Sequence, residues 1–161
     1  MVQNLAERYA QKSFKGPREV SEFPEPSSVI PHRAPFLFVD RVTALDPGQS
    51  ASGSWQLSGD EEFFVGHFPG RPTLPGVLMC EAIAQVGAIA ILSDSKFANK
   101  LPLFGGIDSA RFRRQVSPGD TLEMSVTLTR MSARAGKGSG VATVNGEIAC
   151  QCELFFVIVD A

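Results

Sequence analysis

His67 and Glu81 are the two side chains in the middle of the chain that could transfer protons. An imidazole takes up a proton near neutral pH, so His67 is a candidate general base. Glu81 lies in the apolar segment PGVLMCEAIAQVGAIAIL (residues 75–92), whose only other polar side chain is Gln85. Burying a lone carboxylate is costly, so Glu81 is expected to be either paired or used. Without its context, a hydrogen bond to Gln85 or to another chain is as good an interpretation as catalysis.

The sequence before this segment could place His67 over the start of a helix. Residues 66–76 contain three prolines and three glycines among eleven residues, which predicts a stiff loop with a few permissive points. A helix leaves the first backbone N–H groups unpaired, here those of Gly76 and Val77. With the helix dipole they would stabilise developing negative charge. A base, a carboxyl group and an oxyanion site could thus meet, whereas His32 is expected to be an ordinary, satisfied polar residue.

Residues 75–92 predict the helix that carries Glu81. Pro75 suits a first turn, and apolar residues on every side are typical of a buried helix. Glu81 and Gln85 are four residues apart and would share one face. A membrane span is the alternative, but spans need roughly 20 apolar residues and avoid a central carboxylate. We therefore expect one long helix inside a globular domain.

The rest of the chain has mostly the pattern of strands. Apolar and polar residues alternate in several segments, and Asn145-Gly146 is a strong hairpin signal. The predicted strands cover residues 36–42, 52–58, 121–131, 140–144 and 147–159. A long helix wrapped by a curved antiparallel sheet is an α+β architecture.

The chain divides into an N-terminal arm, residues 1–28, and one domain, residues 29–161. The arm could form a short amphipathic helix and then an extended path imposed by prolines. The helix would use Leu5, Tyr9 and Phe14, and the prolines are Pro17, Pro24 and Pro26. A loosely held arm is expected, and contact with a neighbouring subunit is the alternative.

Composition excludes several classes of protein. The net charge of −2 gives no basic footprint for nucleic acid or an anionic membrane. No signal-peptide core follows the N-terminus, so we expect a cytoplasmic protein. Cys80, Cys150 and Cys152 contain no C-x-x-C pair, which suggests neither disulfides nor a zinc site. Cys150 and Cys152 would share one face of a strand as reduced core residues.

Four collinear motifs resemble those of the FabZ-type β-hydroxyacyl-acyl-carrier-protein dehydratases. The segment GHFPGRPTLPGVLMCEAIAQ, residues 66–85, resembles the family's active-site signature. Residues 30–41 resemble its N-terminal strand motif, residues 104–112 and 116–120 its middle strand and turn, and residues 140–156 its last hairpin. Four motifs in the family's order are a highly specific signal. The resemblance implies the hot-dog fold, a long helix in a bun of antiparallel strands.

The resemblance also implies the site and the reaction. His67 and Glu81 fall on the catalytic pair, Gly76 with Val77 beside it on the oxyanion site, and Gln85 on a supporting position. Glutamate at the acid position favours the FabZ type over the FabA-type dehydratase-isomerases, which carry aspartate. The implied reaction converts (3R)-hydroxyacyl-ACP to trans-2-enoyl-ACP in fatty acid biosynthesis, with the substrate on phosphopantetheine and no metal or redox cofactor.

The partners follow from the same resemblance. Family members are homodimers whose sites each take His from one chain and Glu from the other, and the dimers often form trimers of dimers. The acyl chain would lie in an apolar tunnel, for which we expect Phe63, Phe64, Phe68, Leu103, Ile107 and Phe112; Leu103 replaces the family's gating tyrosine. An acidic carrier protein could bind Arg71, Arg111, Arg113 and Arg114, although a solvated strand face is an equal interpretation of the last three.

Other functions stay open at this stage. A hot-dog thioesterase, an acyl-CoA hydratase and a FabA-like isomerase share the implied fold, and a non-catalytic acyl or carrier binder is the alternative outside enzymes. The segment GKGSG, residues 136–140, lacks the spacing of a phosphate-binding loop and is expected to be a flexible turn.

Overall fold

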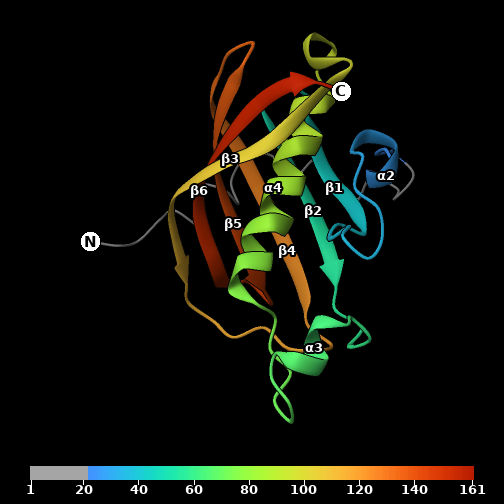
Figure 1. The fold of residues 1–161 in the computed structure, drawn as a ribbon, viewed down its shortest axis with the longest axis vertical. Coiled ribbons are helices and arrows are strands. Elements are labelled where there is room, and N and C mark those ends of the chain that lie inside the picture. Colours follow the sequence, from blue (N-terminus) through green and yellow to red (C-terminus); the bar gives the residue numbers. More distant parts are fainter. Residues whose placement is uncertain (1–21) are drawn as a thin grey trace.

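The computed structural model describes residues 22–161, which form one six-stranded antiparallel sheet around one long helix (Figure 1). The strand order is β1-β2-β4-β5-β6-β3. The strands are β1 (Arg41–Asp46), β2 (Ser50–Gln56), β3 (Lys100–Phe112), β4 (Thr121–Met131), β5 (Ala135–Val144) and β6 (Glu147–Asp160). The helices are α2 (Pro26–Val29), α3 (Phe63–Gly66) and α4 (Gly76–Leu92), followed by the 3-10 helix η1 (Ser95–Phe97).

Helix α4 lies lengthwise against the curved sheet, as Figure 1 shows. From Met79 to Ile91 every residue of α4 except Glu81 is buried, because the helix packs against the sheet and the segment before β1. This arrangement confirms the predicted α+β class and the hot-dog architecture. Glu81 is the one charged residue of α4.

Strand β5 approaches α4 closely because its inward-facing residues include glycines. Gly136, Gly138 and Gly140 alternate with exposed or half-buried residues, and a Cβ atom on Gly140 would collide with Ile83 of α4. The prediction of a flexible turn at residues 136–140 is therefore wrong. Gly140 permits the close approach of β5 to α4, a common use of glycine inside strands, whereas a Cβ atom on Gly136 or Gly138 would meet residues of β4.

A side chain of α4 takes the place of a strand partner for Phe36 and Phe38. The backbone N–H of Phe38 donates to Gln85 Oε1 at 2.8 Å, and the carbonyl of Phe36 accepts from Gln85 Nε2 at 3.2 Å. Phe38 and Val39 are buried here without a sheet ladder. Strand β1 begins only at Arg41, so the predicted strand over residues 36–42 is wrong for its first five residues.

Most other boundaries agree with the sequence. Strand β4 covers residues 121–131 and α4 begins one residue after Pro75, as predicted. Asn145 and Gly146 join β5 to β6 with φ values of 51° and 78°, as a tight hairpin turn requires. Strand β2 begins and ends two residues earlier than predicted.

The predicted arm falls mainly outside the described residues, as do Leu5, Tyr9, Phe14 and Pro17. Pro26 is described, and it begins the short helix α2 instead of an extended path, because proline fits a first helical turn. Across residues 22–161, every helix is too short or too polar to cross a membrane.

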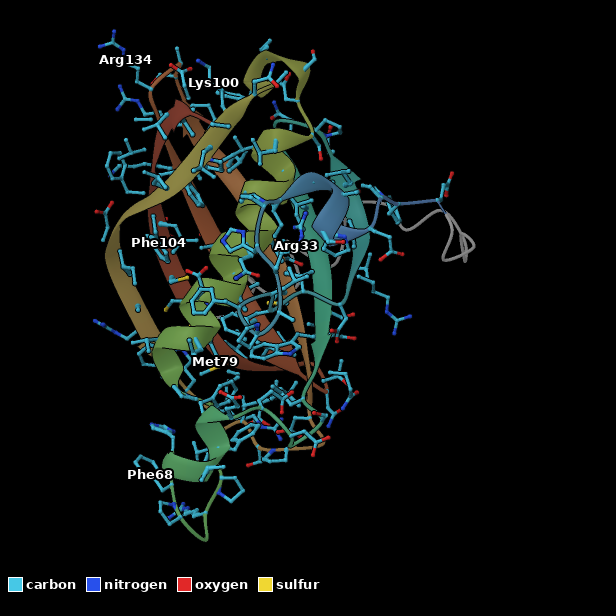
Figure 2. The ribbon with its side chains drawn as sticks, turned by 45° about the vertical axis from the view of Figure 1, so that its right-hand side comes forward. Arg33, Phe68, Met79, Lys100, Phe104 and Arg134 are labelled. Carbon is cyan, nitrogen blue, oxygen red and sulfur yellow. The ribbon has the colours of Figure 1, made fainter. Side chains whose placement is uncertain are left out.

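The two histidine segments reach α4 at different levels. Figure 2 shows Arg33, the neighbour of His32, beside the middle of α4, whereas Phe68, the neighbour of His67, lies beyond the start of the helix. The fold therefore brings two separate loops to one helix.

Candidate active site

A network of backbone hydrogen bonds holds the His67 loop. The N–H of His67 donates to the carbonyl of Phe63 at 2.9 Å, which ends α3, and the N–H of Thr73 donates to the carbonyl of His67 at 2.8 Å. Phe68 and Arg71 exchange two further backbone bonds, at 3.2 and 2.9 Å. The loop that was predicted to be stiff is therefore held by four backbone hydrogen bonds.

The tautomer of His67 follows from one contact. Its Nδ1 lies 2.6 Å from the carbonyl oxygen of Thr73. A carbonyl only accepts hydrogen bonds, so Nδ1 carries the proton in the neutral ring and Nε2 keeps a free lone pair. The imidazole stacks on Phe68 with 4.0 Å between ring centroids, which restricts its rotation.

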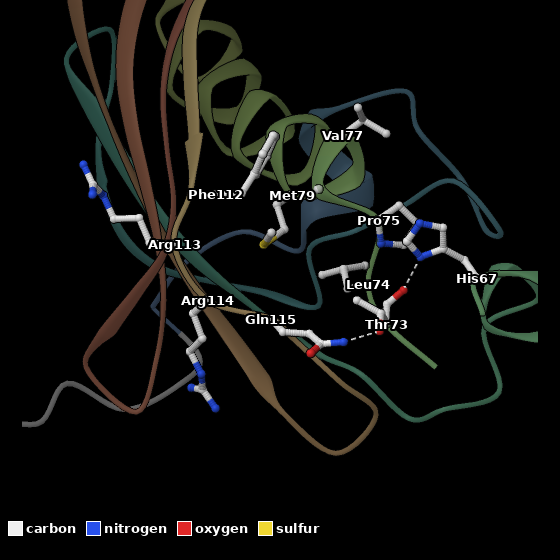
Figure 3. A pocket seen from close by; sticks show the side chains of 11 residues that line it. His67, Thr73, Leu74, Pro75, Val77, Met79, Phe112, Arg113, Arg114 and Gln115 are labelled. Carbon is white, nitrogen blue, oxygen red and sulfur yellow. Dashed lines mark hydrogen bonds between the residues drawn. The ribbon is translucent and has the colours of Figure 1, made fainter. Parts of the chain in front are cut away.

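His67 lines an open cleft of about 580 Å³ (Figure 3). The other walls come from the loop up to Pro75, the first turn of α4 and the chain at the end of β3. In that turn Leu78 and Met79 donate their N–H groups to the carbonyl of Pro75. The N–H groups of Gly76 and Val77 have no acceptor within residues 22–161, as is usual at a helix N-terminus. Both residues line the cleft that His67 also lines.

The ring of Phe112 leaves no room for a side chain at position 76. A Cβ atom there would stand 2.9 Å from the ring of Phe112. Phe112 is the one predicted tunnel residue that lines this cleft. A larger residue at position 76 would displace the wall or the helix start.

Glu81 lies one turn further along α4, beside a second and smaller space of about 30 Å³. Its Oε1 accepts a hydrogen bond from Gln85 Nε2 at 3.1 Å and lies 3.6 Å from His32 Nε2. The Glu81 side chain is 19% exposed and so only partly buried, since this face of the helix opens on the small space. The hydrogen bond to Gln85, one of the interpretations that the sequence left open, is present.

His32 is the residue that sequence reasoning missed at this site. Its Nδ1 is buried and has no hydrogen-bond partner in the described part of the chain, so the prediction of a satisfied polar residue is wrong. The side chain is 24% exposed. A signal was present, since His32 stands in a proline-flanked segment, between Pro31 and Pro35, much as His67 stands in its own.

Within one chain, His67 and Glu81 line different spaces. The cleft contains the candidate base and the free N–H donors, and the small space contains the candidate acid. Each space therefore contains one of the two candidate proton-transfer groups.

The other predicted tunnel residues lie outside these two spaces. Phe64 is buried in the core, and Phe63 packs on it with ring centroids 4.6 Å apart. Phe68, Leu103 and Ile107 are exposed. Phe104, which the sequence did not single out, lines the small space with Glu81. Of the six residues, only Phe112 borders either space.

The four arginines predicted to bind the carrier protein differ in whether a carboxylate lies near the guanidinium group. Arg111 donates only to the carbonyl of its neighbour Ala110, while Arg113 and Arg71 bond to the amide oxygens of glutamines. Arg114 lies 3.9 Å from Asp120 and 3.5 Å from Glu147. Its charge is therefore shared with two carboxylates, and the other three guanidinium groups keep more of theirs.

Three thiols form a cluster on the other side of α4. Cys80, Cys150 and Cys152 are free and buried, and their sulfurs lie within 4.8 Å of one another. The core position predicted for Cys150 and Cys152 is confirmed. Hydrogen bonds with Cys150 and Cys80, and then burial, raise the pKa of Cys152. The spacing did not predict the cluster, because Cys80 comes from the helix and the other two from one face of β6.

Known proteins resemble the chain over nearly the whole domain. Residues 30–153 match the family described as the FabA-like domain. A Clostridium botulinum protein named 3-hydroxyacyl-[acyl-carrier-protein] dehydratase FabZ is 52% identical over 134 residues, which cover 83% of this chain and 93% of that protein. A Staphylococcus carnosus protein of the same name is 49% identical over 141 residues, covering 88% and 97%.

Solved structures add evidence on the fold alone. The dehydratase heterocomplex ApeI:P from Xenorhabdus doucetiae matches with a TM-score of 0.74 and 17% identity, over 86% of this chain and 93% of that one. A hypothetical thioesterase with coenzyme A from Streptococcus pneumoniae matches with a TM-score of 0.59 and 7% identity, over 74% and 85%. The sequence relatives carry the assignment further: the chain belongs to the FabA-like family and, within it, to the FabZ-type dehydratases.

Proposed function

We propose that the protein removes water from (3R)-hydroxyacyl thioesters on the phosphopantetheine of acyl carrier protein and releases trans-2-enoyl thioesters for fatty acid biosynthesis. The observation that carries the proposal is the state of His67, whose Nδ1 is engaged by Thr73 and whose Nε2 is free beside two unpaired N–H groups. The names of the sequence relatives support the same reaction.

The first step uses the cleft. The thioester carbonyl accepts hydrogen bonds from the N–H of Gly76, aided by that of Val77, so charge developing on its oxygen is stabilised at the helix N-terminus. That charge makes the C2 proton removable, and His67 Nε2 takes it as general base. The Thr73 carbonyl stabilises the resulting imidazolium through Nδ1–H.

The second step uses Glu81. The C3–O bond breaks, the C2–C3 double bond forms, and Glu81 gives its proton to the leaving hydroxyl, which departs as water. Exchange with solvent then returns a proton to Glu81 and removes one from His67. No electrons are gained or lost overall, so the proposed steps need no redox cofactor, and the N–H donors and Glu81 act on the two oxygens without a metal.

Gln85 indicates which oxygen of Glu81 carries that proton. The backbone N–H of Phe38 can bond only to the amide oxygen of Gln85, so the amide orientation is fixed and Nε2 is the atom that faces Glu81. An N–H group needs an acceptor, so Oε1 accepts and the acidic proton belongs to Oε2. Oε2 is then the atom that meets the substrate.

A homodimer completes the site in this proposal. Strand β3 is an edge strand, hydrogen-bonded only to β6, and carries the exposed apolar residues Leu103, Phe104, Ile107 and Phe112. An exposed apolar edge favours pairing with another chain. A second copy along this edge would bring its His67 toward Glu81 of the first, and such dimers would assemble further as trimers of dimers. The acyl tunnel would use the exposed Leu103, Ile107 and Phe68, with Phe63 and Phe64 behind them.

The carrier protein would bind beside the cleft in the cytoplasm. Arg113 lines the cleft, and Arg71 and Arg111 are exposed. These cations suit an acidic carrier. Arg114, with its two carboxylate neighbours, would instead contribute by fixing the loop after β3.

The test is a product assay with the full chain and 3-hydroxyacyl-ACPs of graded length. We expect trans-2-enoyl-ACP and water, with no free carrier thiol. Release of the carrier thiol would indicate a thioesterase. Faster turnover of the acyl-CoA substrate would indicate a hydratase, and accumulation of cis-3-enoyl-ACP would indicate a FabA-like isomerase. Binding of acyl-ACP without any product would leave a carrier binder and would contradict the proposal.

A further inference from the structure

We propose that His32 is a positioning residue for Glu81: its imidazole, in the Nε2–H tautomer, holds Glu81 Oε1 as an acceptor so that the acidic proton stays on Oε2. The inference rests on the proposed dehydration and names a residue that the proposed catalytic groups do not include. It starts from the 3.6 Å between His32 Nε2 and Glu81 Oε1.

Only one tautomer makes this contact favourable. Glu81 Oε1 already accepts a bond from Gln85 Nε2, so it presents a lone pair to His32 as well. An unprotonated Nε2 would set two lone pairs against each other, whereas Nε2–H points a donor at an acceptor. At 3.6 Å the attraction is electrostatic, and a small rotation of either side chain would form a hydrogen bond.

The buried Nδ1 supports the same tautomer. This atom has no hydrogen-bond partner in the described residues. With Nε2 protonated, Nδ1 is an unused acceptor, but with Nδ1 protonated the protein would bury an unpaired N–H donor. Buried donors without partners are rarer and costly, so the environment favours Nε2–H.

The segment around His32 is built to keep the ring in place. Ile30 is buried at 2% exposure, and the Arg33 guanidinium donates to the carbonyls of Ile30 at 2.9 Å and of His32 at 2.6 Å. Gln85 binds the same segment further on, through Phe36 and Phe38. One helix side chain therefore fixes both the loop that carries His32 and the carboxyl group that His32 faces.

The surroundings offer Glu81 no other charged partner from the elements that line its space. That space is bordered by His32, Glu81, Gln85 and apolar residues of α4, β3 and β6. At about 30 Å³ it has room for one water-sized group. Glu81 Oε2 is the carboxyl oxygen for which no partner is recorded in residues 22–161, so it is available to a substrate hydroxyl.

Two substitutions of His32 separate positioning from packing. His32→Leu keeps the bulk but removes the donor, and His32→Gln places an amide N–H near the position of Nε2. We expect kcat of His32→Leu to fall on the order of tenfold to a hundredfold, with KM within about twofold, because the acid is misplaced while the binding groups remain. His32→Gln should recover most of the loss. Full kcat in His32→Leu, or an equal loss in both variants, would overturn the inference.

Nuclear magnetic resonance reads the contact without relying on turnover. The chain has two histidines, so ¹⁵N spectra show two imidazoles and His67→Ala assigns them. We expect a proton on His32 Nε2, a free Nδ1, and a shift of the Nε2 resonance in Glu81→Gln that Glu123→Gln on β4 does not produce. A proton on Nδ1, or no response to Glu81→Gln, would exclude the proposed tautomer even if His32→Leu does not fold. If the wild type does not dehydrate hydroxyacyl-ACP, the proposed function fails, and this spectrum still decides the His32–Glu81 contact.

Discussion

The two histidines of the chain are held in opposite ways against the same helix. His67 gives its Nδ1 proton to a backbone carbonyl and keeps Nε2 free in an open cleft. His32 turns Nε2 toward a carboxyl group, and its buried Nδ1 has no partner among residues 22–161. In the proposed reaction the first ring is free to take a substrate proton, and the second orients another group.

The same difference extends to the surroundings of the two rings. The His67 region is an open cleft of about 580 Å³ with unpaired N–H donors, and the His32 region is a space of about 30 Å³ between packed side chains. Only the cleft beside His67 has the volume for a thioester. In the proposed reaction the small space beside His32 therefore acts through Glu81 and Gln85.

The largest expected effect comes from removing either proton-transfer group. His67→Ala and Glu81→Gln should each lower kcat by about 10²–10⁴, since each removes a general base or acid. The melting temperature measured by circular dichroism serves as the folding control. If either variant kept turnover near that of the wild type with 3-hydroxyacyl-ACP, the distinction between the two histidine regions would have no catalytic meaning.

Gly76→Ala should come next, with a loss of about 10²–10³ in kcat. The added Cβ meets the Phe112 ring and shifts the N–H donors that face the thioester oxygen. Gly66→Ala is the matched control, because a Cβ there meets no atom within 4 Å, and it should stay close to wild type. Steady-state kinetics of both variants test the oxyanion role, and an equal response would remove it.

Gln85→Leu should lower both kcat and stability. The substitution leaves the backbone groups of Phe36 and Phe38 without their partner and frees Glu81 Oε1, so we expect about 2–4 kcal/mol less free energy of unfolding. The loss in kcat should be on the order of tenfold. Urea unfolding measures the first effect. Gln49→Leu, an exposed glutamine on the surface, should change stability by less than about 0.5 kcal/mol; a similar change in the two variants would contradict the bridging role.

The smallest effect concerns the carrier protein. Arg113→Glu beside the His67 cleft should raise KM for carrier-bound substrate by about tenfold at low salt and leave KM for a pantetheine analogue nearly unchanged. Arg134→Glu is the control, since Figure 2 shows Arg134 at the end of the molecule opposite Phe68. Equal KM changes for the two substrates would mean that Arg113 acts on the cleft itself.

Local patterns predicted the parts of the fold that local physics determines. The apolar segment from Pro75 gave the buried helix, Asn145-Gly146 gave the hairpin, and the four-residue spacing of Glu81 and Gln85 gave their hydrogen bond. Each depends on residues close together in the chain. Such features can be derived without knowing what packs against them.

The errors arose where distant residues decide the outcome. Residues 36–40 resemble a strand, but Gln85 binds the backbone of Phe36 and Phe38. Gly138 and Gly140 resemble a turn, but they lie inside β5, where Gly138 packs against β4 and Gly140 against Ile83 of α4. His32 meets Glu81 only in the folded chain. Each of these contacts joins residues that are far apart in the sequence, so the contact of His32 with Glu81 emerged only from the structure.

Mixing the two inactive variants tests the central claim most directly. Chains with His67→Ala and chains with Glu81→Gln are unfolded together, refolded and assayed for enoyl-ACP. If each site takes its base from one chain and its acid from the partner, half of the randomly formed dimers have one intact site, and activity should return to about one quarter of the wild type. If both groups of a site came from the same chain, every site would keep one defect. The mixture would then be no more active than the separate variants, which would contradict the account.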